Sequence, residues 1–368
     1  MRIALLAPPL LPVPPIAYGG TERVVATLAT HLHRRGHRLT VFAAGDSRLP
    51  CPVVPVVERA LWPAGFRGDA AAYLQRAVEI AASHADRFDL LHAHVEWHAF
   101  ELARRSRVPV LTTIHGRLDA GATADQLTAY PDVPLVAISD SQRRFAPRAN
   151  WLATIHHGLD FAPPPVRHDG GYLCFLGRVA AEKGIIEAIE VARRVGLRLR
   201  IAAKSHEPSE TALFERVVAP ALDDGTAEFV GELAGRERDE LLAGARATLM
   251  LGDWPEPFGL VAIESLAVGT PVIGRPVGAL PEIIRHGRDG WLVDDLAEAA
   301  AAVGRLAMLA PAQQTAISAR LRFAADRMVD AYERLFESVC AAADERAARP
   351  VATTGRLVRP DADVVPSL

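Results

Sequence analysis

Lysine is almost absent from this chain. Its 41 basic residues include only two lysines, Lys183 and Lys204, and all the others are arginines. Since arginine stands nearly everywhere else, a lysine that persists indicates a position where a compact ammonium is needed and a guanidinium fork does not fit. The alternative is chance survival. Both lysines follow expected strands in the second half of the chain, which favours a function for them.

Cysteines and long apolar runs are scarce as well. Cys51, Cys174 and Cys340 are too far apart for a disulfide framework or a zinc site, so we expect a cytoplasmic protein. The chain has no run of about 18 apolar residues, so no transmembrane span is expected. A net charge of −3 gives no overall field that would attract nucleic acid.

The dinucleotide fingerprint G-x-G-x-x-G is also missing, which argues against a dehydrogenase. The chain instead alternates short apolar runs with helix-like segments, a pattern typical of parallel sheets joined by helical crossovers. A proline-rich linker, residues 160–171, separates two such series. The 368 residues are enough for two doubly wound α/β domains that face each other across a central cleft.

The pattern predicts where each element lies. We expect residues 1–165 to form the N-terminal domain, 166–324 the C-terminal domain, 325–340 a terminal helix and 341–368 a disordered tail that has three prolines and no aromatic residue. Strands are expected at 3–7, 39–43, 90–93, 108–114, 135–138, 172–176, 199–203, 227–230, 248–251 and 272–273. Helices are expected at 21–35, 70–84, 99–105, 182–195, 210–219, 236–243 and 259–268.

One stretch combines a stiff loop with the start of a helix: Asp-Trp-Pro-Glu-Pro-Phe-Gly-Leu-Val-Ala-Ile-Glu, residues 253–264. Its prolines fix the backbone, and Gly259 lets backbone amides face a ligand. A free helix N-terminus suits a phosphate, and the carboxylates of Glu256 and Glu264 can accept hydrogen bonds from sugar hydroxyls. This arrangement is what a sugar nucleotide needs. The alternative is an ordinary loop that leads into a core helix.

Three motifs resemble those of one enzyme family. Glu256 and Glu264, with seven residues between them, are similar to the Glu-x7-Glu signature of the GT-B glycosyltransferases of family 4. The segment from Gly177 to Gly184 resembles the Gly-Arg-x4-Lys-Gly element of that family, and Gly-Gly-Thr-Glu-Arg at 19–23 resembles one of its subgroups. The resemblance covers about residues 1–340. It implies two Rossmann-like domains and a terminal helix that crosses back to the N-terminal domain.

The resemblance also implies roles in binding the donor. Glu264 is expected to hold the ribose hydroxyls of the nucleotide, and Glu256 to bind a hydroxyl of the donor sugar. Lys204 departs from the glycine-rich turn that many members have, although the subgroup tends to carry lysine there. The further residues expected around the donor are Gly19, Gly20, Gly177, Phe258, Gly259 and Leu260.

Catalysis is expected to depend on cations. Arg178 and Lys183 can stabilise the leaving diphosphate, as a metal does in other transferases, so no metal or other cofactor is expected. His115, at the end of a strand, is expected beside the transferred sugar, with a structural histidine as the alternative. Glu22 and His94 are assigned to the acceptor side. A zinc site at the neighbouring histidines 92, 94 and 98 is a further alternative, although no carboxylate or cysteine completes the spacing.

The motifs and the resemblance together predict a glycosyltransferase that uses a nucleoside-diphosphate sugar, with UDP favoured, and an unidentified saccharide, lipid or small molecule as acceptor. Retention of configuration is what the resemblance implies. The alternatives are a nucleotide-sugar epimerase or hydrolase of the same fold, or a binding protein without catalysis. The partners expected are the donor and the acceptor, without nucleic acid. The basic segment 33–38 could touch anionic membrane lipid, but a solvated helix end is the preferred interpretation. The oligomeric state stays open.

Overall fold

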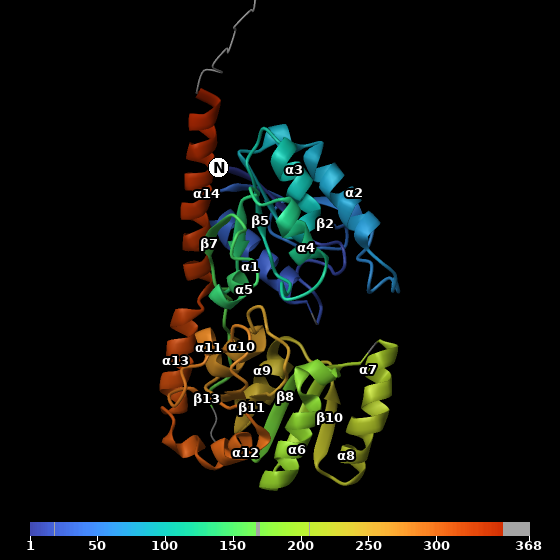
Figure 1. Ribbon diagram of the computed structural model, residues 1–368, viewed down its shortest axis with the longest axis vertical. Coiled ribbons are helices and arrows are strands. Elements are labelled where there is room, and N and C mark those ends of the chain that lie inside the picture. The colour runs from blue at the N-terminus through green and yellow to red at the C-terminus, as the bar shows by residue number, and fades with distance from the viewer. Residues whose placement is uncertain (18, 167–169, 206, 349–368) are drawn as a thin grey trace, which may run out of the picture.

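The computed structural model describes residues 1–17, 19–166, 170–205 and 207–348. Figure 1 shows two domains, one above the other, each built on a parallel sheet with helices on both faces. This confirms the expected doubly wound α/β architecture. Within the described residues, no helix is both long enough and apolar enough to span a membrane.

The N-terminal sheet has seven parallel strands in the order β3-β2-β1-β4-β5-β6-β7. Its inner strand β1 is buried on both faces, so that Ile3 and Leu5 pack into one core while Ala4 and Leu6 pack into the opposite one. Such two-sided burial explains the continuous apolar runs in the sequence. The strands are β1 (Arg2–Leu6), β2 (Arg38–Ala44), β3 (Val53–Val57), β4 (Leu90–Ala93), β5 (Val110–Thr113), β6 (Leu135–Ala137) and β7 (Trp151–Thr154).

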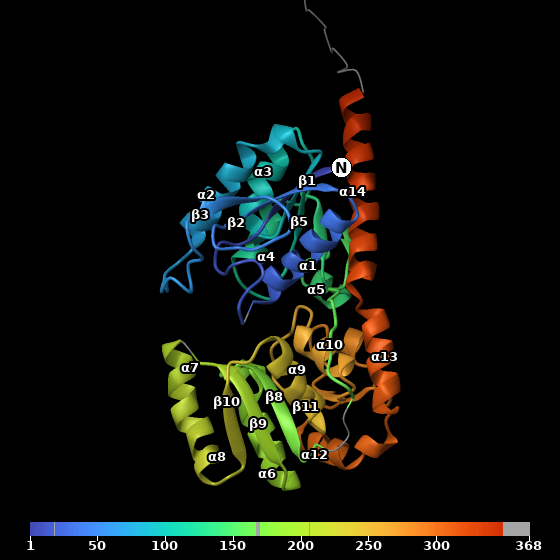
Figure 2. The same ribbon diagram turned by 180° about the vertical axis from the view of Figure 1, so that it is seen from behind.

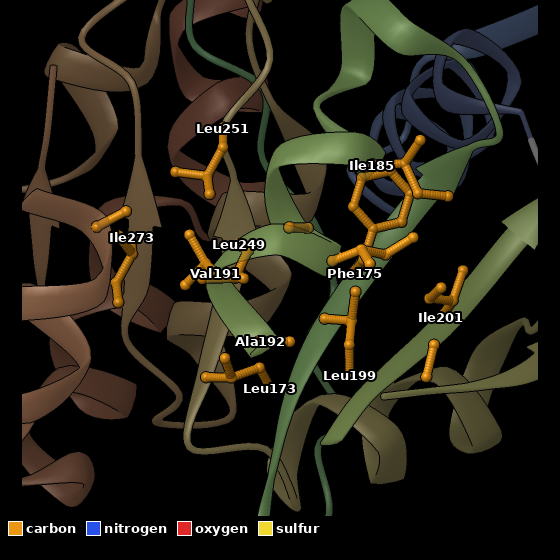
Figure 3. Packing of buried hydrophobic residues seen from close by; sticks show 14 of the residues in the cluster. Leu173, Phe175, Ile185, Val191, Ala192, Leu199, Ile201, Leu249, Leu251 and Ile273 are labelled. Atoms are coloured by element: carbon orange, nitrogen blue, oxygen red, sulfur yellow. The ribbon is translucent and has the colours of Figure 1, made fainter. Parts of the chain in front are cut away.

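The C-terminal sheet has six parallel strands in the order β10-β9-β8-β11-β12-β13. Figure 3 shows its main core, in which Phe175, Leu199 and Leu249 from three strands pack beneath the helix that carries Ile185 and Val191. The strands are β8 (Tyr172–Arg178), β9 (Arg198–Lys204), β10 (Ala227–Gly231), β11 (Ala247–Met250), β12 (Val272–Gly274) and β13 (Gly290–Leu292).

Helices cover both sheets. Those of the N-terminal domain are α1 (Gly20–Arg34), α2 (Ala71–Ala82), α3 (Phe100–Arg105), α4 (Ala122–Ala129) and α5 (Asp140–Arg144). Those that follow in the chain are α6 (Ile185–Val195), α7 (Pro208–Leu213), α8 (Ala219–Asp223), α9 (Gly235–Ala243), α10 (Leu260–Ala267), α11 (Leu280–Ile283), α12 (Leu296–Gly304), α13 (Ala312–Arg322) and α14 (Ala325–Ala348).

Three strands were not predicted from the sequence, namely β3, β7 and β13. β3 reads Val-Val-Pro-Val-Val, and its proline is tolerated because β3 is an edge strand that pairs only with β2. β7 is the opposite edge of the same sheet and is only partly buried, so it lacks an apolar run. β13 has three residues and is an edge as well. β3 and β7 are only partly buried and β13 is very short, so none of the three gives a long apolar run in the sequence.

The last helix, α14, leaves the C-terminal domain and packs on the N-terminal one, as both views show (Figures 1 and 2). Met328, Val329, Tyr332 and Phe336 are buried in the core that also contains Ile3. α14 continues to Ala348, so the disorder assigned to residues 341–348 is wrong. Alanine has the highest helix propensity, and this stretch is rich in it. The rest of the predicted tail, 349–368, lies outside the described residues.

The two connections between the domains run side by side. Leu159, on the first connection, donates from its backbone N–H to Phe323 and accepts from Ala325, at 3.0 and 3.1 Å. A Cβ on Gly158 would lie 2.5 Å from the carbonyl oxygen of Ala324, so only glycine permits this approach. Among the described residues, the two connections are therefore held together where Gly158 and Leu159 meet residues 323–325.

Candidate active site

A cavity of about 320 Å³ lies between the two domains, at the carboxyl ends of strands of both sheets. This is where open α/β sheets bind ligands. The N-terminal domain contributes Gly20, Thr21, His115, Gly116, Arg117, Ile138 and His157 to its wall. The C-terminal domain contributes Phe175, Leu176, Gly177, Arg178, Glu182, Lys183, Leu249, Met250, Gly252, Trp254, Leu280 and the run Glu256–Val261.

The loop before α10 is shaped by two glycines. Gly259 has φ +97° and comes directly before the first helical residue, Leu260, without a side-chain cap. The first amides of α10 are therefore left for a ligand. Gly278 has φ +60°, and a Cβ on it would lie 2.3 Å from the nitrogen of Glu256. This close contact holds the Glu256 turn against the cavity.

Lys183 and Glu256 form an ion pair in the cavity wall. The Lys183 Nζ atom lies 2.6 Å from Glu256 Oε1, and the two side chains are 19% and 20% exposed. Lys183 ends the short helical turn Ala181–Lys183, and Glu256 comes from the loop before α10. The predicted phosphate-binding cation and the predicted sugar-binding carboxylate thus meet at one point.

Arg178 also lines the cavity, with acidic neighbours that the sequence analysis did not identify. Its guanidinium donates to Glu182 at 2.9 Å and to Glu210 at 3.0 Å. Glu210 is almost fully buried, so these contacts fix the direction of the guanidinium. Arg178 lines the cavity together with Gly177 and Lys183.

Glu264 is only 4% exposed and is not among the residues that line the cavity. Its Oε1 atom lies 2.5 Å from Arg23 Nη1 and 3.0 Å from Arg238 Nη1. Neither arginine was predicted to take part in the site. In this conformation the expected ribose-binding carboxylate is covered by an arginine from each domain.

Four other predicted residues do not line the cavity, namely His94, Lys204, Glu22 and Gly19. Lys204 lines a neighbouring cavity of about 270 Å³, where its ammonium lies 5.0 Å from the centre of the Trp62 ring. Glu22 is buried in the first turn of α1, and burial raises the pKa of its carboxyl to about 7. A Cβ on Gly19 would lie 2.7 Å from Pro15, so Gly19 is needed for packing of the loop.

Several histidines form a neutral cluster on the N-terminal side. His115 Nε2 and His94 Nδ1 are 2.8 Å apart, and the rings of His115 and His157 stack with centres 5.2 Å apart. Burial lowers the pKa of His115 to about 3 and holds the pKa values of His94 and His157 well below the usual range. Neutral imidazoles are therefore available to hydrogen-bond a sugar or an acceptor hydroxyl.

The three histidines considered for zinc have separate partners. His92 contacts the hydroxyl of Thr113 at 2.8 Å, His94 contacts His115, and His98 contacts the carbonyl of Val95 at 2.9 Å. Across the part of the chain that the structure describes, no three His, Cys, Asp or Glu side chains are arranged to hold a metal ion.

Glu96 is a further residue that the sequence analysis missed. Its Oε1 accepts hydrogen bonds from the backbone N–H groups of His115 and Gly116 at 2.9 and 3.0 Å. Glu96 has φ +52°, a conformation that non-glycine residues rarely adopt, and burial raises the pKa of its carboxyl to about 7. The only signal in the sequence was its position two residues after His94.

Two family models match the chain and together cover most of it. The model described as "Glycosyltransferase Family 4" matches residues 18–160, and "Glycosyl transferases group 1" matches residues 159–320. Their boundary coincides with the first connection between the domains.

Among curated proteins, a glycogen synthase of Mycobacterium tuberculosis is 30% identical over 374 residues, covering 85% of this chain and 88% of the relative. A D-inositol 3-phosphate glycosyltransferase of Mycolicibacterium smegmatis is 27% identical and covers 75% of each chain.

Among solved structures, the sucrose-phosphate synthase of Thermosynechococcus elongatus has a TM-score of 0.76 at 21% identity, covering 93% of this chain and 99% of the other. The Anabaena protein HepE, in complex with UDP and glucose, has a TM-score of 0.71 at 17% identity, covering 92% and 100%.

Proposed function

The chain belongs to the glycosyltransferases of family 4, with the GT-B fold, and on that premise we propose that it transfers a sugar from a UDP-sugar to an acceptor hydroxyl with retention of configuration. One observation carries this proposal. Lys183, Glu256 and the free N-terminus of α10 meet His115 of the opposite domain around a single cavity. A diphosphate and a sugar need these groups side by side.

The two cations act on the leaving group. As the bond between the anomeric carbon and the phosphate oxygen breaks, negative charge builds up on the diphosphate. Arg178 and Lys183 offset that charge, and both are held by carboxylates before the substrate arrives. Fixed charges of this kind cost no reorganisation during the reaction. This is why we propose that the reaction needs no metal ion.

The sugar end of the cavity contains Glu256 and the neutral His115. Glu256 accepts a hydrogen bond from a hydroxyl of the donor sugar, and His115 contacts the sugar from the N-terminal domain. The acceptor oxygen attacks the anomeric carbon on the face that the diphosphate leaves. The diphosphate takes the proton of the acceptor hydroxyl, so no covalent enzyme intermediate is needed.

Glu264 binds the ribose in this proposal, which requires a rearrangement. The Arg23 side chain belongs to the N-terminal domain, and Arg238 belongs to the same domain as Glu264. Moving the N-terminal domain away uncovers the carboxylate while Arg238 stays beside it. Closure after binding then excludes water from the donor.

UDP is the nucleotide that we propose, because UDP is bound by HepE, which has a similar fold. The acceptor is a saccharide, a lipid or a small molecule. We keep the cytoplasm as the proposed location. Contact with a membrane surface through residues 33–38 has less support, because Arg35 is paired with Asp326, Asp330 and Glu333 of α14.

Thermal melting with UDP, GDP, ADP and NAD at millimolar concentration tests the proposal. A ligand that binds only the folded state adds about 2.7 kcal/mol at one hundred times its dissociation constant. We expect UDP to raise the melting temperature most. A larger rise in melting temperature with GDP or ADP would mean that the donor carries guanine or adenine and not uracil. No rise with any nucleoside diphosphate would contradict the assignment of the cavity as the donor site.

Turnover separates transfer from the other activities of this fold. With UDP-glucose and a panel of acceptors, a transferase forms UDP and a glycoside whose anomeric configuration NMR can read. Release of free sugar at the same rate with and without acceptors would instead indicate a hydrolase. Tight binding of UDP-sugars without product in any mixture would indicate a binding protein.

A further inference from the structure

The indole of Trp254 lies against the ammonium of Lys183. The Nζ atom is 4.6 Å from the centre of the ring, while Glu256 Oε1 lies 2.6 Å from the same Nζ. A cation over an aromatic face at this distance is attracted by the ring quadrupole. The ammonium is therefore restrained by a carboxylate and by an aromatic ring.

The backbone fixes the ring relative to the lysine. A Cβ on Gly184 would lie 2.2 Å from the nitrogen of Gly252, and a Cβ on Gly252 would lie 2.1 Å from the carbonyl oxygen of Glu182. Two glycines thus allow the lysine turn and the tryptophan loop to touch backbone to backbone. The backbone N–H of Trp254 donates to that same Glu182 carbonyl at 3.1 Å. Trp254 is tied to the segment that carries Lys183.

The opposite domain reaches the same ring. The Arg117 guanidinium lies 4.3 Å from the centre of the Trp254 ring, and Arg117 comes directly after the His115-Gly116 turn. Asp119 holds the guanidinium, with Nε 2.5 Å from Oδ1. The indole Nε1 is buried without a hydrogen-bond partner among the described residues. The contribution of Trp254 therefore comes from its ring face, which contacts a cation from each domain.

We propose that Trp254 is a positioning residue for Lys183, and that Arg117 makes this positioning depend on contact between the domains. The inference rests on the proposed function, in which Lys183 stabilises the leaving diphosphate. When the domains separate, Arg117 leaves the ring and the ring is less restrained. The ammonium is then fully restrained only in the closed state, in which the access of water to the donor is limited and hydrolysis is slow.

The scarcity of lysine allows a direct test of the geometry. Reductive methylation with ¹³C-formaldehyde labels Lys183, Lys204 and the N-terminal amine, and Lys204→Arg and Lys183→Arg variants assign the signals. We expect an upfield shift of the Lys183 methyl signal, caused by the ring current of Trp254. Trp254→Leu should return it to the position of free dimethyllysine, Trp254→Phe should keep part of the shift, and Arg117→Met should reduce it.

Turnover tests the consequence, with slow hydrolysis of UDP-glucose as the readout. Because the loss of a desolvated cation–π contact leaves the ammonium less restrained, we expect Trp254→Leu to lower kcat about tenfold and leave KM within about twofold. Trp254→Phe should restore most of kcat, and Arg117→Met should lower kcat by a smaller factor. Arg305→Met is the matched control, because Arg305 lies 4.7 Å from the Trp291 ring centre and neither residue lines the cavity.

The proposal is overturned if Trp254→Leu leaves the Lys183 signal unchanged, or moves the signal without lowering kcat. It is also overturned if Arg305→Met lowers kcat as much as Arg117→Met. Melting curves of each variant check that the chain is folded. If Trp254→Leu does not fold, Trp254→Phe is compared with the wild type in its place. If the wild-type chain neither binds UDP nor hydrolyses UDP-glucose, the proposed donor is wrong, while the Lys183 signal still decides whether Trp254 and Arg117 position the ammonium.

Discussion

Arg23 of α1 and Glu264 of α10 form an ion pair across the domain boundary, with Nη1 and Oε1 2.5 Å apart. Arg238 lies 3.0 Å from the same oxygen. Removing a carboxylate from water is costly, and the two arginines offset that cost for the buried Glu264 side chain. The pair therefore contributes to closure of the cleft and also covers the oxygen expected to bind ribose.

Replacing Arg23 with Met should make UDP bind more tightly, by about three- to tenfold. A nucleotide that needs Glu264 must displace Arg23, and a ligand shifts an equilibrium by its differential affinity for the two states. Calorimetric titration with UDP measures the change. Arg34→Met, at an exposed position of the same helix, is the control. Unchanged or weaker UDP binding in Arg23→Met would show that the ion pair does not compete with the nucleotide.

Glu256 and Glu264 should respond differently to removal. Glu264→Ala is expected to weaken binding of UDP itself by at least tenfold, because the ribose hydrogen bonds to a charged group are lost. Glu256→Ala is expected to bind UDP nearly as well as the wild type but to lose turnover, since Glu256 contacts only the sugar. Titration with UDP and with UDP-glucose separates the two effects. Equal behaviour of both variants would contradict the assigned roles.

Lys183→Arg should be poorly tolerated although it keeps the charge. The Lys183 ammonium lies 2.6 Å from Glu256 and 4.6 Å from the Trp254 ring centre. A guanidinium is larger and planar, so it cannot make both contacts from the same position. We expect at least a tenfold loss of kcat, by analogy with loss of one charge-assisted hydrogen bond of about 1.5–3 kcal/mol. Lys204→Arg, in the neighbouring cavity, is the comparison. Near-wild-type turnover in Lys183→Arg would remove the argument for a point charge.

Glu96→Gln should stabilise the protein at alkaline pH. The folded pKa of about 7 exceeds the ordinary 4.5, so the folded state binds more protons between these values and its stability falls as pH rises through 7. Gln keeps an acceptor oxygen for the amides of His115 and Gly116. We expect a gain of about 1–3 kcal/mol at pH 8 and none at pH 4, measured by urea unfolding. Glu337→Gln, at an exposed position, should show no such pH dependence.

The sequence was most informative where chemistry depends on neighbouring residues. The Glu256 loop, the Arg178–Lys183 element and the His115 turn were identified from local motifs, and the structure brings them to one cavity. Their spacing is fixed by a strand end or a helix start, which sequence patterns describe well. Their roles in the reaction stay predictions.

Contacts between the domains could not be predicted in this way. Arg23 meets Glu264, and Arg117 meets Trp254, only because two separately folded domains are docked. No periodicity or spacing relates such residues, which lie more than a hundred positions apart in the chain. The same reason explains why Lys204 lines a different cavity, since its position depends on how the Trp62 loop of the other domain lies.

The return of α14 to the N-terminal domain has a consequence for biosynthesis. Tyr332 and Phe336 complete the core that β1 begins, so the N-terminal domain leaves the ribosome before the C-terminal domain but is completed after it. Until α14 has been translated, the apolar surface around Ile3 and Leu5 lacks the part of its cover that Tyr332 and Phe336 provide. Apolar surface that is exposed in this way during synthesis is prone to aggregation, the hazard against which chaperones act.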